Sequence, residues 1–149
     1  MMELNETVLP FDGIPASLPV SAGLRVDSAI LPLEGGTDPT FGKVRWKTLF
    51  SADVTQTSDM VLGIAQFDAG DTLEPHRHAP SEFYFGLSGS GEVTIDGIVH
   101  PISAGVALFI PSNAEHGTVA GPEGLSFAYG FPRASFAEVE YQFSAGRVD

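Results

Sequence analysis

Cysteine is absent from this chain of 149 residues. Its absence excludes a disulfide framework, a thiolate metal site and a cysteine nucleophile. Basic residues are also scarce, with 7 Lys and Arg against 19 Asp and Glu and a formal net charge of −12. A surface this acidic argues against a nucleic-acid backbone or an anionic membrane as a partner.

Long apolar runs are missing as well. The longest covers residues 106–110, far short of a bilayer span. The first residues carry two acids before any base and lack the apolar run of a signal peptide, so we expect a cytoplasmic protein. Hydrophobic residues make up 43% of the chain, which excludes wholesale disorder and fits one compact domain.

Helical periodicity is absent too, whereas turn residues are abundant, with 17 Gly and 11 Pro. Short strand-like runs follow one another from residue 43 onward, which predicts an all-β sandwich or barrel. An Asp96-Gly97 pair marks a hairpin and the Ser/Gly run 88–91 predicts a turn. Residues 1–40, rich in Pro, Gly and Ser, are expected to form a partly irregular N-terminal arm, followed by one domain over 41–149. The expected strands cover residues 44–50, 60–67, 83–87, 93–95, 98–99, 106–110, 126–131 and 137–143.

Three of the four histidines fall in two short segments that resemble strand ends. His76 and His78 are two residues apart, so on a strand both point to one face. Pro80 interrupts the ladder and lets Glu82 enter on the same side, while His116 can come from a facing strand. Three imidazoles and a carboxylate suit a divalent transition metal. The alternative is a pair of ordinary half-buried histidines.

The two segments resemble the motifs of the cupin superfamily. Five residues fill the fixed positions of the first motif: Gly70, His76, His78, Glu82 and Gly89. In the second motif Gly105, Pro111 and His116 match, Asn113 stands where Gly is usual, and Ala120 stands where Asn is usual. The resemblance implies a single jelly-roll barrel, the double-stranded β-helix, with one metal (Fe, Mn, Ni or Zn) held by His76, His78, Glu82 and His116.

Tyr84 lies two residues after Glu82, so it faces the same interior while Phe83 and Phe85 face outward. A tyrosine beside a dication is a candidate general base, because the metal favours the phenolate. The alternative is that Tyr84 fills the barrel. Likewise Lys43, Arg45 and Lys47 either hold a substrate carboxylate or form the solvent face of an edge strand, with Trp46 packed inward.

A narrower set of residues resembles the small cupin dimethylsulfoniopropionate (DMSP) lyases. It comprises the run 44–47, the block from His76 to Tyr84, the run 113–116, Phe131-Pro132 and the run 136–141. In that family the tyrosine two residues after the Glu is the proposed base, which corresponds to Tyr84. A second tyrosine on a late strand has its nearest candidate in Tyr129, unless Ala128 occupies the cavity-facing position.

The resemblance predicts a metal-dependent lyase that performs proton abstraction and β-elimination on a small carboxylate such as DMSP. Two alternatives remain, a non-haem iron dioxygenase with the same ligands and a non-catalytic cupin that binds a small molecule. We expect a homodimer, because dimers are usual among small cupins, with an edge strand or the arm as a means of contact.

Overall fold

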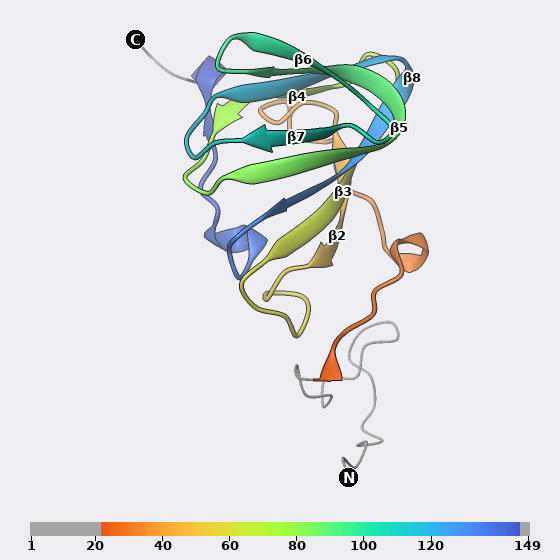
Figure 1. The fold of residues 1–149 in the computed structure, drawn as a ribbon, viewed down its shortest axis with the longest axis vertical. Coiled ribbons are helices and arrows are strands. Elements are labelled where there is room, and N and C mark those ends of the chain that lie inside the picture. Colours follow the sequence, from red (N-terminus) through yellow and green to blue (C-terminus); the bar gives the residue numbers. More distant parts are fainter. Residues whose placement is uncertain (1–21, 147–149) are drawn as a thin grey trace.

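The computed structural model describes residues 22–146. These residues form an all-β structure in which strands curl into an open barrel (Figure 1). Besides the strands there are only short 3-10 helices in this part of the chain, and none is long and apolar enough to cross a bilayer. The elements are η2 (Ser28–Ile30), β1 (Glu34–Gly35), β2 (Arg45–Phe50), β3 (Val61–Phe67), β4 (Thr72–Arg77), β5 (Glu82–Ile95), β6 (Ile98–Ser103), β7 (Ala107–Ile110), β8 (His116–Phe131), η3 (Phe136–Glu138), β9 (Gln142–Phe143) and η4 (Ser144–Gly146).

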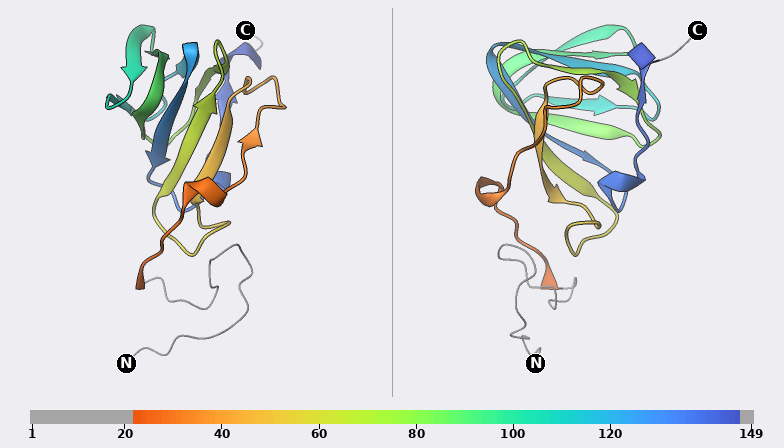
Figure 2. Two further views of the ribbon diagram at one scale, coloured as in Figure 1. Left: turned by 90° about the vertical axis from the view of Figure 1, so that its right-hand side faces the viewer. Right: turned by 180° about the vertical axis from the view of Figure 1, so that it is seen from behind.

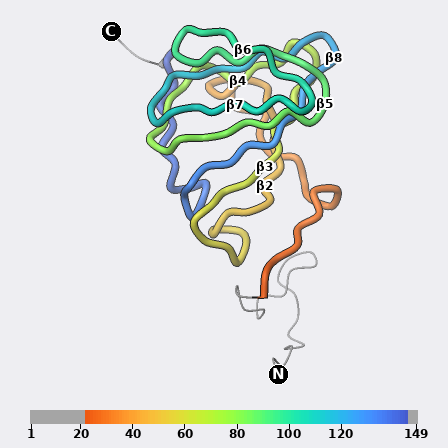
Figure 3. Tube along the Cα trace, viewed as in Figure 1, coloured from red at the N-terminus to blue at the C-terminus, as the bar shows by residue number. Residues whose placement is uncertain are grey.

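The two longest strands, β5 and β8, organise the barrel. They pair with each other over most of their length in antiparallel register. The C-terminal half of β8 also pairs with β3, and its N-terminal half pairs with β4. Strand β8 therefore connects β3 to β4 in the sheet. The strands run as β1-β2-β3-β8-β4-β9, and β5 adds β6 and β7 on its other side. Figure 2 shows the resulting curl from two further directions, and Figure 3 follows the chain through it.

Side-chain alternation follows the predicted period of two. Along β3, buried and partly exposed residues alternate without a break from Val61 to Phe67. In β5, Glu82 and Tyr84 are buried whereas Phe83 and Phe85 are 44% and 42% exposed. Because successive strand residues point to opposite faces, this alternation carries the polar groups of the first motif into the barrel.

The turn predicted at residues 88–91 is wrong, because β5 runs unbroken through it. The small residues instead bend the strand, and the pairing with β8 shifts register on both sides of Ser88 and Gly89. Gly89 has φ +70°, and a Cβ there would lie 2.1 Å from the Gly124 carbonyl oxygen. Close backbone approach therefore explains this glycine. The hairpin is confirmed, since Asp96 and Gly97 both have positive φ between β5 and β6.

The strand predicted over residues 137–143 is also wrong. Residues 136–138 form η3, and only Gln142 and Phe143 join the sheet, next to β4. The apolar residues of this segment pack against the barrel mouth, so their alternation reflects contact with an aromatic cluster. At the other end β1 pairs with β2 as a two-residue edge strand, while residues 1–21 of the predicted arm lie outside the described residues.

Candidate metal centre and cavity

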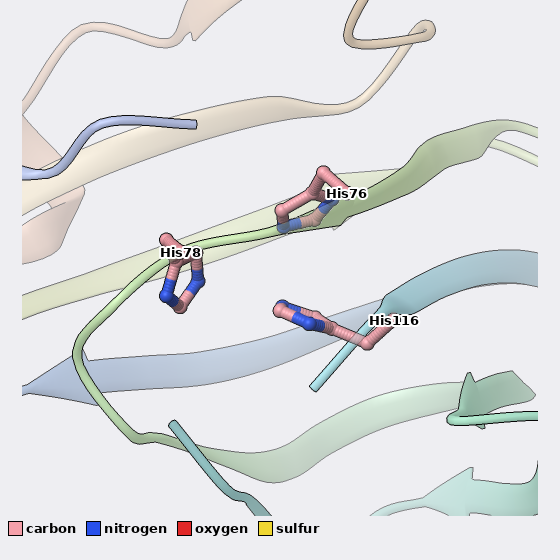
Figure 4. A group of neighbouring side chains, drawn as sticks. All are labelled: His76, His78 and His116. Atoms are coloured by element: carbon pink, nitrogen blue, oxygen red, sulfur yellow. The ribbon is translucent and has the colours of Figure 1, made fainter. Parts of the chain in front are cut away.

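Three strands bring the predicted ligands to one place. His76 lies near the end of β4, His78 follows that strand, Glu82 begins β5 and His116 begins β8. His76 and His116 are register partners across the β4–β8 pair. Figure 4 shows the imidazoles of His76, His78 and His116 turned toward one another. All four ligand side chains belong to residues no more than 4% exposed.

The distances within this cluster fit one ion. One ring nitrogen from each histidine lies within 4.8 Å of those of the other two. Glu82 Oε1 lies 3.1 Å from His78 Nε2 and 3.2 Å from His116 Nε2. The carboxylate thus closes the side of the cluster between those two rings.

Backbone carbonyls orient the three imidazoles. The Nδ1 atoms of His76, His78 and His116 lie 2.7, 2.9 and 2.9 Å from the carbonyl oxygens of residues 74, 80 and 114. A carbonyl only accepts, so each Nδ1 carries the proton and donates, and each Nε2 presents a lone pair to the cluster. Two Nε2 lone pairs then face the Glu82 carboxylate, an arrangement that repels unless a cation or a proton lies between. The donor set therefore fits a divalent transition metal.

Burial sets the charge states around the cluster. It lowers the pKa of His76 to about 3, with the neighbouring His116 as the next cause, so this ring stays neutral as a metal ligand must be. Burial would raise the pKa of Glu82, but its interaction with the imidazoles of His116 and His78 outweighs burial and holds that pKa below its usual value. The cluster consequently carries a carboxylate able to balance part of a dication's charge.

Tyr84 lies inside the barrel, as its parity with Glu82 predicts. It is 2% exposed, its ring stacks on Phe127 with centroids 4.0 Å apart, and it lies 6.1 Å from the His116 ring. Burial, followed by the charge of Glu82, raises the pKa of Tyr84 well above its usual value. The buried Thr118 hydroxyl lies next to Tyr84 and acts on this pKa in the opposite direction. Tyr84 therefore keeps its proton unless a positive charge lies nearby.

A small cavity of about 40 Å³ adjoins the cluster. Its walls are mostly aromatic, and Glu82 is the only charged residue among the described residues that line it. The lining residues are Phe41, Val44, Trp46, Ala65, Leu73, Glu82, Tyr84, Phe127, Tyr129, Phe136 and Tyr141.

Comparison with known proteins identifies this barrel. Residues 63–126 match the family of the cupin domain. The dimethylsulfoniopropionate lyase DddW of Ruegeria pomeroyi is 63% identical over 120 residues, covering 80% of this chain and 79% of DddW. The chain belongs to the cupin family of DddW.

Solved structures agree on the fold of this cupin. The polyketide cyclase RemF from Streptomyces resistomycificus has a TM-score of 0.68 at 22% identity, over 81% of this chain and 84% of RemF. A chain from the crystal structures of the DMSP lyases RdDddP and RnDddQII has a TM-score of 0.65 at 15% identity, over 76% of this chain and 62% of that one. At these identities the likeness concerns the jelly-roll fold alone, and it confirms the predicted barrel.

The basic cluster of the cupin lies away from its cavity. On the surface Arg45 Nη2 lies 3.4 Å from Asp68 Oδ1. Lys47 Nζ donates a hydrogen bond to the carbonyl oxygen of Ser28 at 2.8 Å. Lys43 borders a separate, open groove. Of the two interpretations of this cluster, the structure favours the solvent face, whereas Trp46 packs toward the cavity as predicted.

Two tyrosines in the C-terminal part of the chain are candidates for the second tyrosine that the resemblance implies. Tyr129 is 6% exposed and faces the cavity, its ring lying over Gly63, so the cavity-facing position is not taken by Ala128. Sequence reasoning missed Tyr141, whose ring stacks on His76 at 4.9 Å and lies 5.1 Å from His78. Tyr141 is two residues from Val139, so the alternation of the segment already predicts that both side chains point inward. By itself, this alternation indicates only an ordinary strand.

Proposed function

We propose that this protein is a metal-dependent lyase that cleaves dimethylsulfoniopropionate. The observation that carries the proposal is the 63% identity to the lyase DddW over most of both chains. The site supports it, because Glu82 of the buried His/His/Glu/His cluster and the interior Tyr84 line one cavity.

The cavity chemistry suits this substrate at both ends. DMSP carries a carboxylate at one end and a dimethylsulfonium cation at the other. A metal ion held by the four ligand side chains would bind the carboxylate. The aromatic walls, which include Trp46, Phe127 and Phe136 and carry no basic residue, provide faces that attract a desolvated cation.

The residues of this chain divide the reaction between them. His76, His78, Glu82 and His116 would hold one divalent transition metal, of the Fe, Mn, Ni or Zn type. When bound, that ion supplies a Lewis acid that neutralises the substrate carboxylate and the negative charge developing beside it. Beside that positive charge Tyr84 would be the phenolate, and its Oη takes the proton from Cα, the C–H electron pair forms the Cα=Cβ double bond, and the C–S pair leaves with sulfur. The products are acrylate and neutral dimethyl sulfide, with the proton left on Tyr84.

A headspace assay for dimethyl sulfide tests the function. Metal-reconstituted protein is expected to release dimethyl sulfide from DMSP, and removal of the metal with a chelator to abolish the release. The chelated protein should keep its β circular-dichroism spectrum and a cooperative unfolding transition, because a chain of this length buries a core of its own. Absence of release with every candidate metal, or oxygen uptake in place of elimination, would contradict the proposal.

We further propose that the protein is a homodimer joined through an outer apolar face. This face, formed by outward residues of β5 and β7, consists of Phe83, Phe85, Leu87 and Phe109, which are 44%, 42%, 43% and 69% exposed. None of the four is charged, although the chain carries a net charge of −12. Two such acidic copies repel each other least where both surfaces are uncharged, and these large side chains supply much of the ~800 Å² per partner that a stable dimer buries.

Phe109→Glu is expected to convert the dimer to monomers, since it places two carboxylates in the centre of the contact. Light scattering coupled to size exclusion measures the mass. Val99→Glu, at a 52% exposed position on β6 away from this face, is the control and should stay dimeric. A wild-type protein that is monomeric at tens of micromolar would overturn the dimer.

A further inference from the structure

Substrate cannot reach the metal ligands in the conformation described. The four ligand residues are between 1% and 4% exposed. The adjoining cavity is closed on one side by Phe41, Phe136 and Tyr141, whose rings contact one another with centroids 5.6 and 5.8 Å apart. Two of these three residues belong to the C-terminal strap, which we define as residues 136–146.

The strap covers the strand ends at the barrel mouth, where the dark-blue segment in Figures 1 and 2 runs past the ends of several strands. Its Tyr141 stacks on His76, and its Phe143 lies 5.4 Å from the same ring. If the strap moved away from the mouth, the face of the His76 ring that Tyr141 and Phe143 cover would therefore become exposed.

The strap packs Val139 into the core and Phe136 N donates to Ser51 Oγ at 2.8 Å, but its other polar attachments to the barrel are few. Its only strand, β9, pairs two residues with β4, matching His76 with Phe143 and Arg77 with Gln142. Ser144 Oγ donates a hydrogen bond to Glu115 Oε2, which also lies 3.6 Å from Arg77 Nη2. Such a partly exposed ion pair contributes little to stability. A segment held by so few bonds opens at a lower free energy than the long β5–β8 pairing.

We propose that the strap is the gate of this active site, and that it opens as a unit to admit substrate. The proposal rests on the lyase function for its role in turnover, but the movement itself is a property of the fold. Tyr141 travels with the strap, so closure both encloses the substrate and returns this ring to its place over His76. Glu115, next to the ligand His116, is the latch that joins the closed strap to the centre.

The absence of cysteine allows a direct test by disulfide locking. Arg77 and Gln142 are antiparallel partners on the outer face, so Cys at both positions has the Cα separation of about 4.5–5.5 Å that a disulfide accepts. The matched control is Thr94→Cys with Val99→Cys, a partner pair in β5 and β6 remote from the strap. The metal-loaded double variants are compared oxidised and reduced, by transfer of bound zinc to a coloured chelator and by turnover of DMSP.

Oxidation of the Arg77→Cys/Gln142→Cys variant is expected to slow zinc transfer and turnover by about tenfold or more, and reduction to restore both, while the control pair changes neither. Equal rates in the oxidised and reduced forms would overturn the gate. Redox-dependent zinc transfer without any lyase activity would support the gate and refute the proposed function. Ser144→Ala, which removes the latch hydrogen bond without a new cross-link, should speed zinc transfer several-fold, and an unchanged rate would count against the gate.

Discussion

Tyr84→Phe is expected to lower DMSP turnover by about 10²-fold or more, which is the range that a general base contributes. The substitution removes one oxygen and keeps the ring that stacks on Phe127 at 4.0 Å, so fold and metal content should be retained. The loss should fall on kcat and much less on KM, because the proton leaves Cα only in the transition state. Steady-state dimethyl sulfide release, with metal content measured on the same samples, checks this.

Two other cavity tyrosines serve as comparisons for Tyr84. Tyr129→Phe and Tyr141→Phe change the same atom on the same cavity wall. Tyr141 lies over the histidine ligands and Tyr129 over Gly63, so the pair also distinguishes which late tyrosine takes part in the reaction. If Tyr84→Phe retained full turnover, the elimination mechanism with this base would be wrong.

Glu82→Gln is expected to lower metal affinity by about 10²-fold and to abolish most activity with it. The change keeps the shape of the side chain but removes the negative charge between His78 Nε2 and His116 Nε2, which lie 3.1 and 3.2 Å from the carboxylate. A neutral amide is the poorer ligand, and its NH₂ group cannot bind a cation. Competition titration against a chelator of known affinity measures the loss.

The fourth histidine provides the control for the metal centre. His100 lies on β6, opposite Val93, and outside the cluster, so His100→Ala should bind the metal as the unchanged protein does. His78→Ala, at a position just beyond β4, should lose the metal without loss of the β fold. Full metal binding by Glu82→Gln and by His78→Ala would show that the ion, if any, binds elsewhere.

Local sequence patterns predicted which side chains of each motif face the barrel interior, because strand parity acts over a few residues. His76 and His78 share a face by strand parity, and Tyr84 follows Glu82 on the same face for the same reason. The positions that need positive φ were also predictable: Asn113, at φ 62°, takes the place usual for glycine. The role of each ligand and of Tyr84 stays a prediction until the variants are measured.

Sequence patterns gave a wrong prediction where the same residues fit two different structures. The Ser/Gly run at 88–91 has the residues of a turn, but there the glycines allow β5 to pass close to the Gly124 backbone. The alternation at 137–143 has the period of a strand, but there it reflects packing of aromatic rings over the barrel mouth. In both cases the deciding contact comes from a segment distant in the sequence.

The sequence by itself determined the all-β class and the inward face of each motif strand, because a strand's period of two and the backbone freedom of glycine act over a few residues. Only the tertiary structure decided that Tyr129 faces the cavity, that Lys43, Arg45 and Lys47 do not, and that Tyr141 covers His76. These outcomes depend on β8 lying between β3, β4 and β5, and on the strap crossing the mouth. Such contacts join residues far apart along the chain, and no local period encodes them.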